Sequence, residues 1–438
     1  MRYYATAAEA AGAGYRPCLR CRPEAAPGSP AWTGTSAVVQ RALRLIQDGA
    51  LDHASLSNLA TRLGIGVRHL SRLFAQHVGA SPATVAQTRR LHFAKRLLDD
   101  THLPITDIAH AAGFGSIRRF NDAFRETYRK SPRELRKGKR IGIDENEGAE
   151  IALRLAYRPP YDWGYMQSFL AANAIPGVEV VTADHYSRAA PTPSGYAVLR
   201  IRPVAHAHAL EVGMKRAMPA ELPALLSSVR RMFDLTADPS RIAAAMHNDR
   251  LLQPLLDRRP GLRIPGTWNA FECSVCAIVG QRGSIAGRGF LKRLVERFGK
   301  PIDALGADVH YLFPTAAVLA DANLDDLGLS RPRCEALRQL ARGVCDKRIR
   351  FDATAEEVSR MLCDLPGVGR RTAGYVELRG LGEPDAFPFG DLLLRRLAST
   401  GSKPLTAMAL EDRAEGWRPF RGYAVFHLWA SEQPRRAA

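Results

Sequence analysis

A short turn between two helix-forming stretches, Leu365-Pro366-Gly367-Val368-Gly369, constrains the fold of this chain more than any other feature. Pro366 ends the preceding helix, and the two glycines allow the positive φ angles that a tight turn needs. We expect a new helix over residues 370–380. The amides at the start of such a helix point outward and can bind an anion. The sequence therefore predicts a helical hairpin whose turn can bind a phosphate.

A single carboxylate, Asp391, follows this hairpin after a loop rich in Pro and Gly. It precedes an apolar stretch over residues 392–397, and Asp is a favoured N-cap residue. These residues alone leave two interpretations open. In the first, Asp391 is only a helix cap and the glycine turn is only a connection. In the second, the turn binds a DNA phosphate and Asp391 takes part in chemistry.

The charge distribution indicates a polyanionic partner. The 438 residues carry a formal net charge of +18. Residues 1–140 contain 23 Lys and Arg against 10 Asp and Glu, so most of the excess lies in the first third of the chain. Double-stranded DNA is the partner that such a basic segment predicts.

Residues 37–140 contain an internal repeat. Leu59-Ala60-x3-Gly64-x-Gly66 recurs 49 residues later as Ile108-Ala109-x3-Gly113-x-Gly115. Each copy predicts a short helix, a glycine turn and a second helix, and the second helices are expected at about 67–76 and 116–128. A basic helix face is often only a solvated surface, but two basic copies in one basic segment favour DNA binding. The outward side chains that can contact bases or phosphates are Arg68, His69 and Arg72 in the first copy and Arg118, Arg119 and Asn121 in the second.

This repeat resembles the AraC-type double helix-turn-helix. The resemblance implies that both second helices enter successive turns of the major groove, about 34 Å apart. It also implies a promoter operator as a DNA target and RNA polymerase as a further partner.

Near the N-terminus, Cys18 and Cys21 form a Cys-x-x-Cys pair in a basic setting. A structural zinc site needs about four ligands, so this pair is incomplete. The segment resembles the end of the Ada-type methylphosphotriester-repair zinc domain, in which two further Cys precede this point and one accepts the methyl group. We expect residues 1–30 to be a remnant of that domain, or the start codon to be placed too far downstream. Zinc is expected only if upstream ligands exist.

The remainder of the chain changes character twice. Residues 137–150 read as a linker, and residues 150–237 as a small α+β domain with strands at 151–157, 178–183 and 195–204. From about residue 239 the sequence predicts a run of helices, among them 270–279, 302–312 and 422–431.

Seven Cys, an odd number, indicate a reducing compartment. We find no signal peptide and no membrane-spanning stretch, so a cytoplasmic protein is expected.

Five segments resemble the AlkA-like 3-methyladenine DNA glycosylase II family of the helix-hairpin-helix superfamily. They are residues 158–169, 280–281, 365–380, 385–391 and 418–429. The resemblance implies a multidomain, mainly α fold: a zinc-domain remnant (1–30), an AraC-type double helix-turn-helix domain (37–140), a TBP-like α+β domain (150–237) and an all-α helix-hairpin-helix glycosylase domain (238–433).

The same resemblance assigns roles to individual residues. Asp391 is the expected catalytic carboxylate, and no cofactor is expected for the glycosylase. Gln281 and Arg282 are expected to contact DNA, and Arg282 stands where family members insert an aliphatic wedge residue into the duplex. Arg371 stands where bifunctional relatives have a Lys, so we expect a monofunctional enzyme. The lesion pocket is expected from Phe169, Tyr375 and Trp429, together with Arg371 and Leu392 at two positions where the best-known members have aromatics, and the phosphate anchor from Gly367 and Gly369.

The favoured function is thus a glycosylase that excises alkylated bases, fused to a transcription-regulating module of the response to alkylation. One alternative is an AraC-type transcriptional activator whose glycosylase-like half only senses damaged DNA. Another is a double helix-turn-helix protein with a small-molecule domain. The position of Asp391 behind the hairpin favours the glycosylase.

Overall fold

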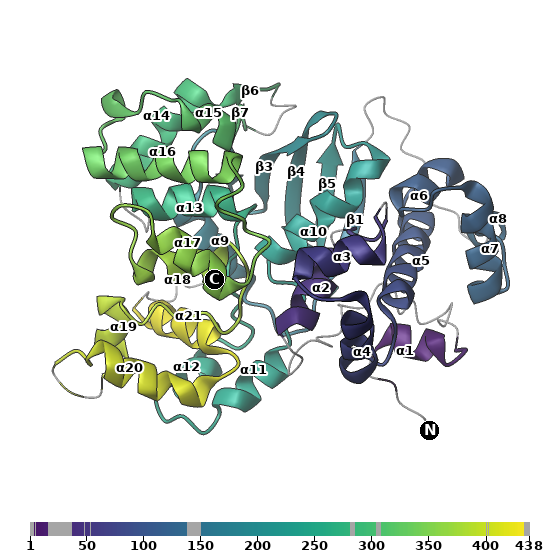
Figure 1. The fold of residues 1–438 in the computed structure, drawn as a ribbon, viewed down its shortest axis with the longest axis horizontal. Coiled ribbons are helices and arrows are strands. Elements are labelled where there is room, and N and C mark those ends of the chain that lie inside the picture. Colours follow the sequence, from purple (N-terminus) through teal and green to yellow (C-terminus); the bar gives the residue numbers. More distant parts are fainter. Residues whose placement is uncertain are drawn as a thin grey trace. The chain divides into compact units, whose positions relative to one another are not determined.

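The computed structural model describes residues 4, 6–15, 37–47, 49–52, 54–137, 150–280, 285–303, 308–399, 401 and 403–432 (Figure 1). They belong to two compact units, Met1–Tyr157 with Ala190–Ser228 and Arg158–Ala189 with Val229–Ala438. The Cys18 and Cys21 pair, the predicted DNA-contacting residues Gln281 and Arg282, and most of the predicted linker lie outside the described residues. No helix in the described part is long and apolar enough to cross a membrane.

The first unit contains the repeat that the sequence predicts. In each copy a glycine with positive φ ends the first helix, Gly64 at 72° and Gly113 at 82°. The 19-residue helix α5, which joins the two copies, was not predicted. The helices of this region are α2 (Ala37–Gln47), α3 (Leu56–Leu63), α4 (Val67–Val78), α5 (Pro82–Asp100), α6 (Ile105–Ala111), α7 (Ile117–Tyr128) and α8 (Pro132–Lys137), preceded by α1 (Ala7–Gly12).

The α+β region has more strands than predicted. In the first unit β5 (Ala209–Lys215) lies between β1 (Ile151–Ala156) and β4 (Gly195–Pro203), antiparallel to both, with Val212 opposite Leu153 and Ile201. In the second unit β2 (Glu179–Val181) pairs with β3 (Tyr186–Thr192). β3 escaped prediction because it buries a charged residue, Arg188, which breaks the expected apolar alternation. Two helices flank these strands in the sequence, α9 (Trp163–Asn173) and α10 (Leu222–Met232).

The rest of the second unit is helical around two hydrophobic cores. The first core is built mainly by α13 (Ala270–Val279), α14 (Ile285–Phe298), α15 (Ala316–Ala320), α16 (Arg331–Cys345), α17 (Ala355–Cys363) and α18 (Arg370–Arg379). The second core is built mainly by α11 (Pro239–Met246), α12 (Gln253–Arg258), α19 (Leu392–Leu397), α20 (Ala407–Ala414) and α21 (Arg421–Ser431). Tyr375 on α18 packs against both cores, so it lies where the two meet.

The predicted helix over 302–312 was wrong. The structure has a short antiparallel pair instead, β6 (Lys300–Pro301) with β7 (Tyr311–Leu312). The amides of His310 and Tyr311 both donate to the carbonyl oxygen of Gly177, at 2.8 and 3.0 Å. These bonds to a distant segment hold the chain extended, and no local pattern in the sequence reveals them.

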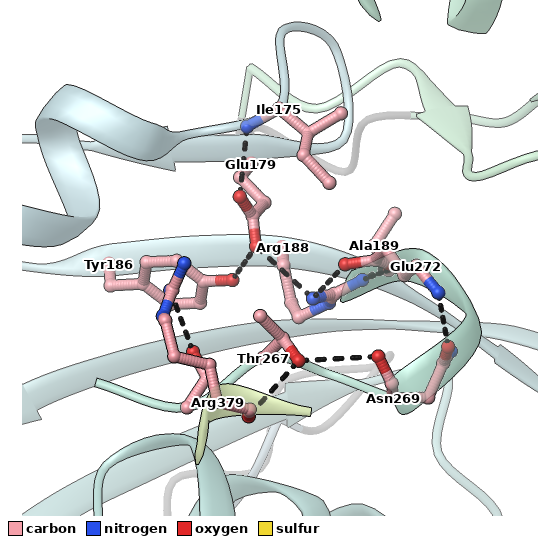
Figure 2. A network of polar contacts seen from close by, with 10 residues as sticks. Ile175, Glu179, Tyr186, Arg188, Ala189, Thr267, Asn269, Glu272 and Arg379 are labelled. Atoms are coloured by element: carbon pink, nitrogen blue, oxygen red, sulfur yellow. Dashed lines mark hydrogen bonds and ion pairs between the residues drawn. The ribbon is translucent and has the colours of Figure 1, made fainter. Parts of the chain in front are cut away.

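A buried cation connects the strands of the second unit to its helices (Figure 2). Arg188 on β3 is 1% exposed, and its guanidinium donates to Glu272 Oε2 on α13 at 3.1 Å and to Glu179 Oε1 on β2 at 3.2 Å. The guanidinium also stacks on the Trp268 ring, 4.5 Å from its centroid. Burial disfavours the charge, but Glu272, Tyr186 and Glu179 together outweigh this effect, and the pKa of Arg188 is raised above its usual value.

The same network continues to α18. Asn269 accepts a hydrogen bond from the Glu272 amide at 2.8 Å and so caps α13. Thr267 donates to the carbonyl oxygen of Asn269 at 3.2 Å and to that of Arg379 at 3.3 Å (Figure 2). Three segments far apart in sequence are thereby held in one arrangement.

We predict that Glu272→Gln lowers the free energy of unfolding of the second unit by about 3 kcal/mol, because it leaves a buried cation with one carboxylate partner fewer. The measurement is urea unfolding followed by tryptophan fluorescence, which reports mainly on this unit because four of the five Trp lie in it. Glu432→Gln is the matched control: it removes an ion pair of Glu432 with Arg396 at 2.7 Å in which both side chains are exposed. The control should change stability by less than about 0.5 kcal/mol. Equal effects of the two variants would contradict the role given to the network.

Candidate active site

The hairpin between α17 and α18 has the open turn that its sequence predicts. The Val368 amide donates to the Leu365 carbonyl oxygen at 3.1 Å, and Gly367 has φ of 73°, where a side chain would be strained. Gly369 is the N-cap of α18. A Cβ atom added at Gly367 or Gly369 would meet no described atom within 4 Å. A phosphate can therefore approach the amides at the start of α18 without a steric barrier.

Close packing holds the loop after α18 against that helix. A Cβ atom on Gly374 would lie 3.3 Å from Pro388 Cα, which is a tight contact. At the other end of the loop, the Gly422 amide of α21 donates to the Pro384 carbonyl oxygen at 2.8 Å. The Asp391 amide closes the loop by donating to the Pro388 carbonyl oxygen at 2.9 Å. The position of the candidate catalytic carboxylate is thus set by two helices.

Asp391 is a helix cap, and it also lines a pocket. Its Oδ1 accepts a hydrogen bond from the Leu394 amide at 3.0 Å and caps α19. The residue is only 2% exposed, yet it lines a pocket. A carboxylate that is fixed by a backbone bond and faces a cavity is suited to stabilising positive charge in a reacting group.

The pocket has a volume of about 60 Å³ and lies where the two cores of the second unit meet. Among the described residues of its wall, Asp391 is the only acid and Arg371 the only base. The wall consists of Cys276, Ala277, Gly280, Arg371, Thr372, Tyr375, Pro388, Asp391 and Trp429. Burial raises the pKa of Cys276 well above its usual value, so its thiol is neutral there.

The structure brings together four of the predicted site residues and leaves two outside the pocket wall. Arg371, Tyr375, Asp391 and Trp429 line the pocket, and the ring centroids of Tyr375 and Trp429 are 6.5 Å apart. Phe169 packs instead against Phe426, at 5.5 Å between centroids. Leu392 is 60% exposed at the start of α19 and does not line the pocket.

Asp385, the other acid of this loop, is engaged elsewhere. Its carboxylate accepts hydrogen bonds from Arg418 Nη1 and from Arg421 Nε, the latter at 3.0 Å. It does not line the pocket. This arrangement makes Asp385 a structural ion-pair partner and leaves Asp391 as the candidate catalyst.

Arg379 is a residue of the site that the sequence analysis missed. It is buried behind Tyr375, where its Nε donates to the Pro265 carbonyl oxygen at 2.6 Å and its Nη2 to that of Gly266 at 3.1 Å. Its Nη1 donates to the Tyr375 hydroxyl. The only signal in the sequence was the i, i+4 spacing of Tyr375 and Arg379, which places both on one face of a helix.

In the first unit, the predicted DNA-reading side chains lie on the second helix of each copy. Arg68, His69 and Arg72 of α4 are exposed, and Arg72 Nη2 lies 2.9 Å from His69 Nδ1. In α7, Arg118 and Arg119 are exposed and Asn121 is half-buried. Buried aromatic residues on the opposite face of each helix, such as Phe74 and Phe120, hold these faces outward.

Comparison with known proteins gives matches along the whole chain. Residues 152–269 match a family model described as the AlkA N-terminal domain, residues 59–138 a helix-turn-helix domain, and residues 1–24 the metal binding domain of Ada. The chain is 38% identical to the probable bifunctional transcriptional activator/DNA repair enzyme AlkA of Mycobacterium tuberculosis, over 98% of this chain and 88% of that protein.

Two further comparisons concern the C-terminal two thirds. The chain is 33% identical to DNA-3-methyladenine glycosylase 2 of Escherichia coli, over 65% of this chain and 99% of that protein. The 3-methyladenine DNA glycosylase of Archaeoglobus fulgidus has a similar fold, with a TM-score of 0.57 at 22% identity over 65% of this chain and 99% of that one. The chain therefore belongs to the AlkA-like family of DNA glycosylases, in the form that also carries an AraC-type helix-turn-helix segment.

Proposed function

We propose that this protein is a DNA glycosylase that hydrolyses the N-glycosidic bond of alkylated bases, of the 3-methyladenine type that its relatives are named for. The observation that carries the proposal is the carboxylate of Asp391. The Leu394 amide holds it in place and it lines a pocket, and in the sequence it follows the hairpin that we expect to bind a phosphate. A base inside a duplex cannot reach such a pocket, so the damaged nucleotide has to leave the stack. The amides at Gly367 and Gly369 would anchor the distorted backbone through one of its phosphates.

The reaction breaks the bond between C1′ and the base nitrogen, whose electron pair leaves with the base. The sugar becomes an oxocarbenium-like cation, water adds to C1′, and the water loses a proton. A carboxylate about 4 Å from a unit positive charge contributes about 4 kcal/mol at an effective dielectric constant of 20. That energy corresponds to roughly a thousandfold in rate. Asp391 supplies this stabilisation.

In this proposal the enzyme is monofunctional, because no amine nucleophile lines the described part of the pocket wall. Strand cleavage by a bifunctional glycosylase requires an amine that forms an imine with C1′. Arg371 stays protonated and cannot react in that way, and no Lys lines the pocket among the described residues. The product is then an abasic site in an unbroken strand.

The first unit adds a transcription-regulating module to this enzyme. Its two basic helices, α4 and α7, would bind a promoter operator in successive major grooves, with RNA polymerase as a further partner. A pure activator that only senses damage is the second candidate, supported by these exposed Arg residues. The position of Asp391 in a pocket favours turnover over sensing.

We predict that Asp391→Asn lowers the rate constant of base release by about a thousandfold, because the negative charge is removed. Asn is also a good N-cap, so the start of α19 and the affinity for DNA should be preserved. The measurement is single-turnover release of free base from a duplex with one alkylated base. Asp385→Asn is the control and should retain release. An active Asp391→Asn variant would refute the assignment of Asp391, and a wild-type protein that binds the lesion without releasing any base would favour the sensor.

We also predict that the wild-type protein leaves the DNA backbone intact after base release. On a denaturing gel the labelled strand should stay full-length until alkali is added, and borohydride should trap no covalent complex. Asp391→Asn serves as the blank, since its product should contain few alkali-labile sites. Cleavage without alkali, or a trapped complex, would mean that an amine of this chain reacts with the sugar.

For the first unit, we predict that Arg72→Ala together with Arg119→Ala weakens binding to undamaged duplex and reduces its salt dependence. The slope of log K against log salt should become shallower by about one for each phosphate that the protein no longer neutralises. Arg348→Ala, an exposed Arg in the second unit, is the control and should leave the slope unchanged. Base release at saturating enzyme should be unaffected in all variants. An unchanged slope in the double variant would exclude this face from DNA binding.

A further inference from the structure

The lesion pocket carries more positive charge than its single acid balances. Arg371 lines the pocket, and no ion pair joins its guanidinium to a carboxylate of the described residues. Arg379 lies directly behind the wall, with its guanidinium carbon 5.3 Å from the centre of the Tyr375 ring. Its hydrogen bonds go to carbonyl oxygens and a phenol, so no described carboxylate neutralises it either. Two cations therefore flank the wall that carries Tyr375.

The aromatic rings that could attract a cationic base are partly used by the protein itself. Arg379 lies over the Phe169 ring, 4.7 Å from its centroid, as well as over Tyr375. An aromatic face that already contacts a guanidinium has less negative potential to offer a second cation. Of the two aromatics that line the pocket, Tyr375 and Trp429, the first is therefore already in contact with a cation of the protein. Attraction of a positively charged base is correspondingly weak here.

The charge of the transition state decides which bases such a pocket favours. A neutral base that departs with the electron pair of the glycosidic bond becomes negative while the sugar becomes positive. The pocket wall holds one cation, Arg371, and one anion, Asp391, so it contains a charge of each sign that could stabilise these two developing charges. A cationic base instead becomes neutral as it accepts the electron pair, and its positive charge passes to the sugar. Arg371 therefore repels it when it binds and gives its departure no stabilisation. Only interactions that stabilise the transition state accelerate the reaction.

We infer that Arg371 is a specificity-determining residue that directs this pocket towards neutral alkylated purines and against cationic ones, by stabilising the departing neutral base as it becomes negative. The inference rests on the proposed glycosylase activity and adds a ranking by charge: 3-methyladenine in DNA is itself cationic, so we expect it to be released less readily than a neutral alkylated purine. A purely phosphate-binding role for Arg371 would instead affect all lesions equally.

The test compares two alkylated purines that differ in charge, neutral 1,N6-ethenoadenine and cationic 7-methylguanine, each placed singly in the same duplex. Release of free base is measured under single-turnover conditions over a range of enzyme concentrations, for the full-length protein and two variants. Arg371→Gln removes the charge and keeps hydrogen-bonding capacity. Arg371→Lys keeps the charge and is the matched control. Because a Lys at this position could form an imine with C1′, borohydride trapping is run in parallel to detect any such reaction.

For Arg371→Gln we expect the rate of ethenoadenine release to fall at least tenfold, while release of 7-methylguanine at subsaturating enzyme stays constant or rises. The ratio between the two lesions should stay within about threefold of wild type in Arg371→Lys. An equal decrease for both lesions in Arg371→Gln, or no decrease for ethenoadenine, would overturn the inference. A wild-type protein that releases only 7-methylguanine would overturn it too while leaving the proposed function intact. Release of neither base would overturn the inference, and if 3-methyladenine were not released either, the result would count against the proposed function itself.

Discussion

The buried guanidinium of Arg188 is the interaction on which the second unit depends. A cation that is buried away from water is stable only if carboxylates pair with it, and here Glu179 on β2 and Glu272 on α13 do so. Through the cap of α13 and Thr267 the same network reaches Arg379 on α18. α13 and α18 supply most of the pocket wall. The ion pairs of Arg188 and the hydrogen bonds of Arg379 hold these two helices and therefore help to set the geometry of the site.

The parts of the structure that were predictable from sequence are those encoded locally. The glycine turn, the start of α18 and the cap at Asp391 depend on neighbouring residues and were all correct. The parts that were missed depend on distant partners. Arg188 in β3 and Arg379 in α18 were not singled out, because a sequence shows a cation but not the carbonyl or carboxylate that it contacts. The hairpin β6–β7 was missed for the same reason, since its bonds reach Gly177.

The two units use positive charge in opposite ways. On α4 and α7 the Arg side chains are exposed, and in the proposed function they bind DNA phosphates and release the counterions condensed there, which would make binding sensitive to salt. At the pocket, Arg379 is buried and shielded from salt, so its field acts on whatever enters. The net charge of the whole chain therefore sums two groups of Arg residues with different proposed roles. Those on α4 and α7 would set the affinity for DNA, and those at the pocket would set the electrostatic environment of the reacting base.

The bond between Asp391 and the Leu394 amide has a consequence for how the site tolerates change. It removes the torsional freedom of the carboxylate when the protein folds, so no rotamer search remains when DNA arrives. It also restricts the side chain to one methylene, since a longer acid would move its oxygens away from the amide. A Glu at position 391 would therefore keep the negative charge but lose the cap and the orientation of the carboxylate. The length of the side chain at this position is thus as restricted as its charge.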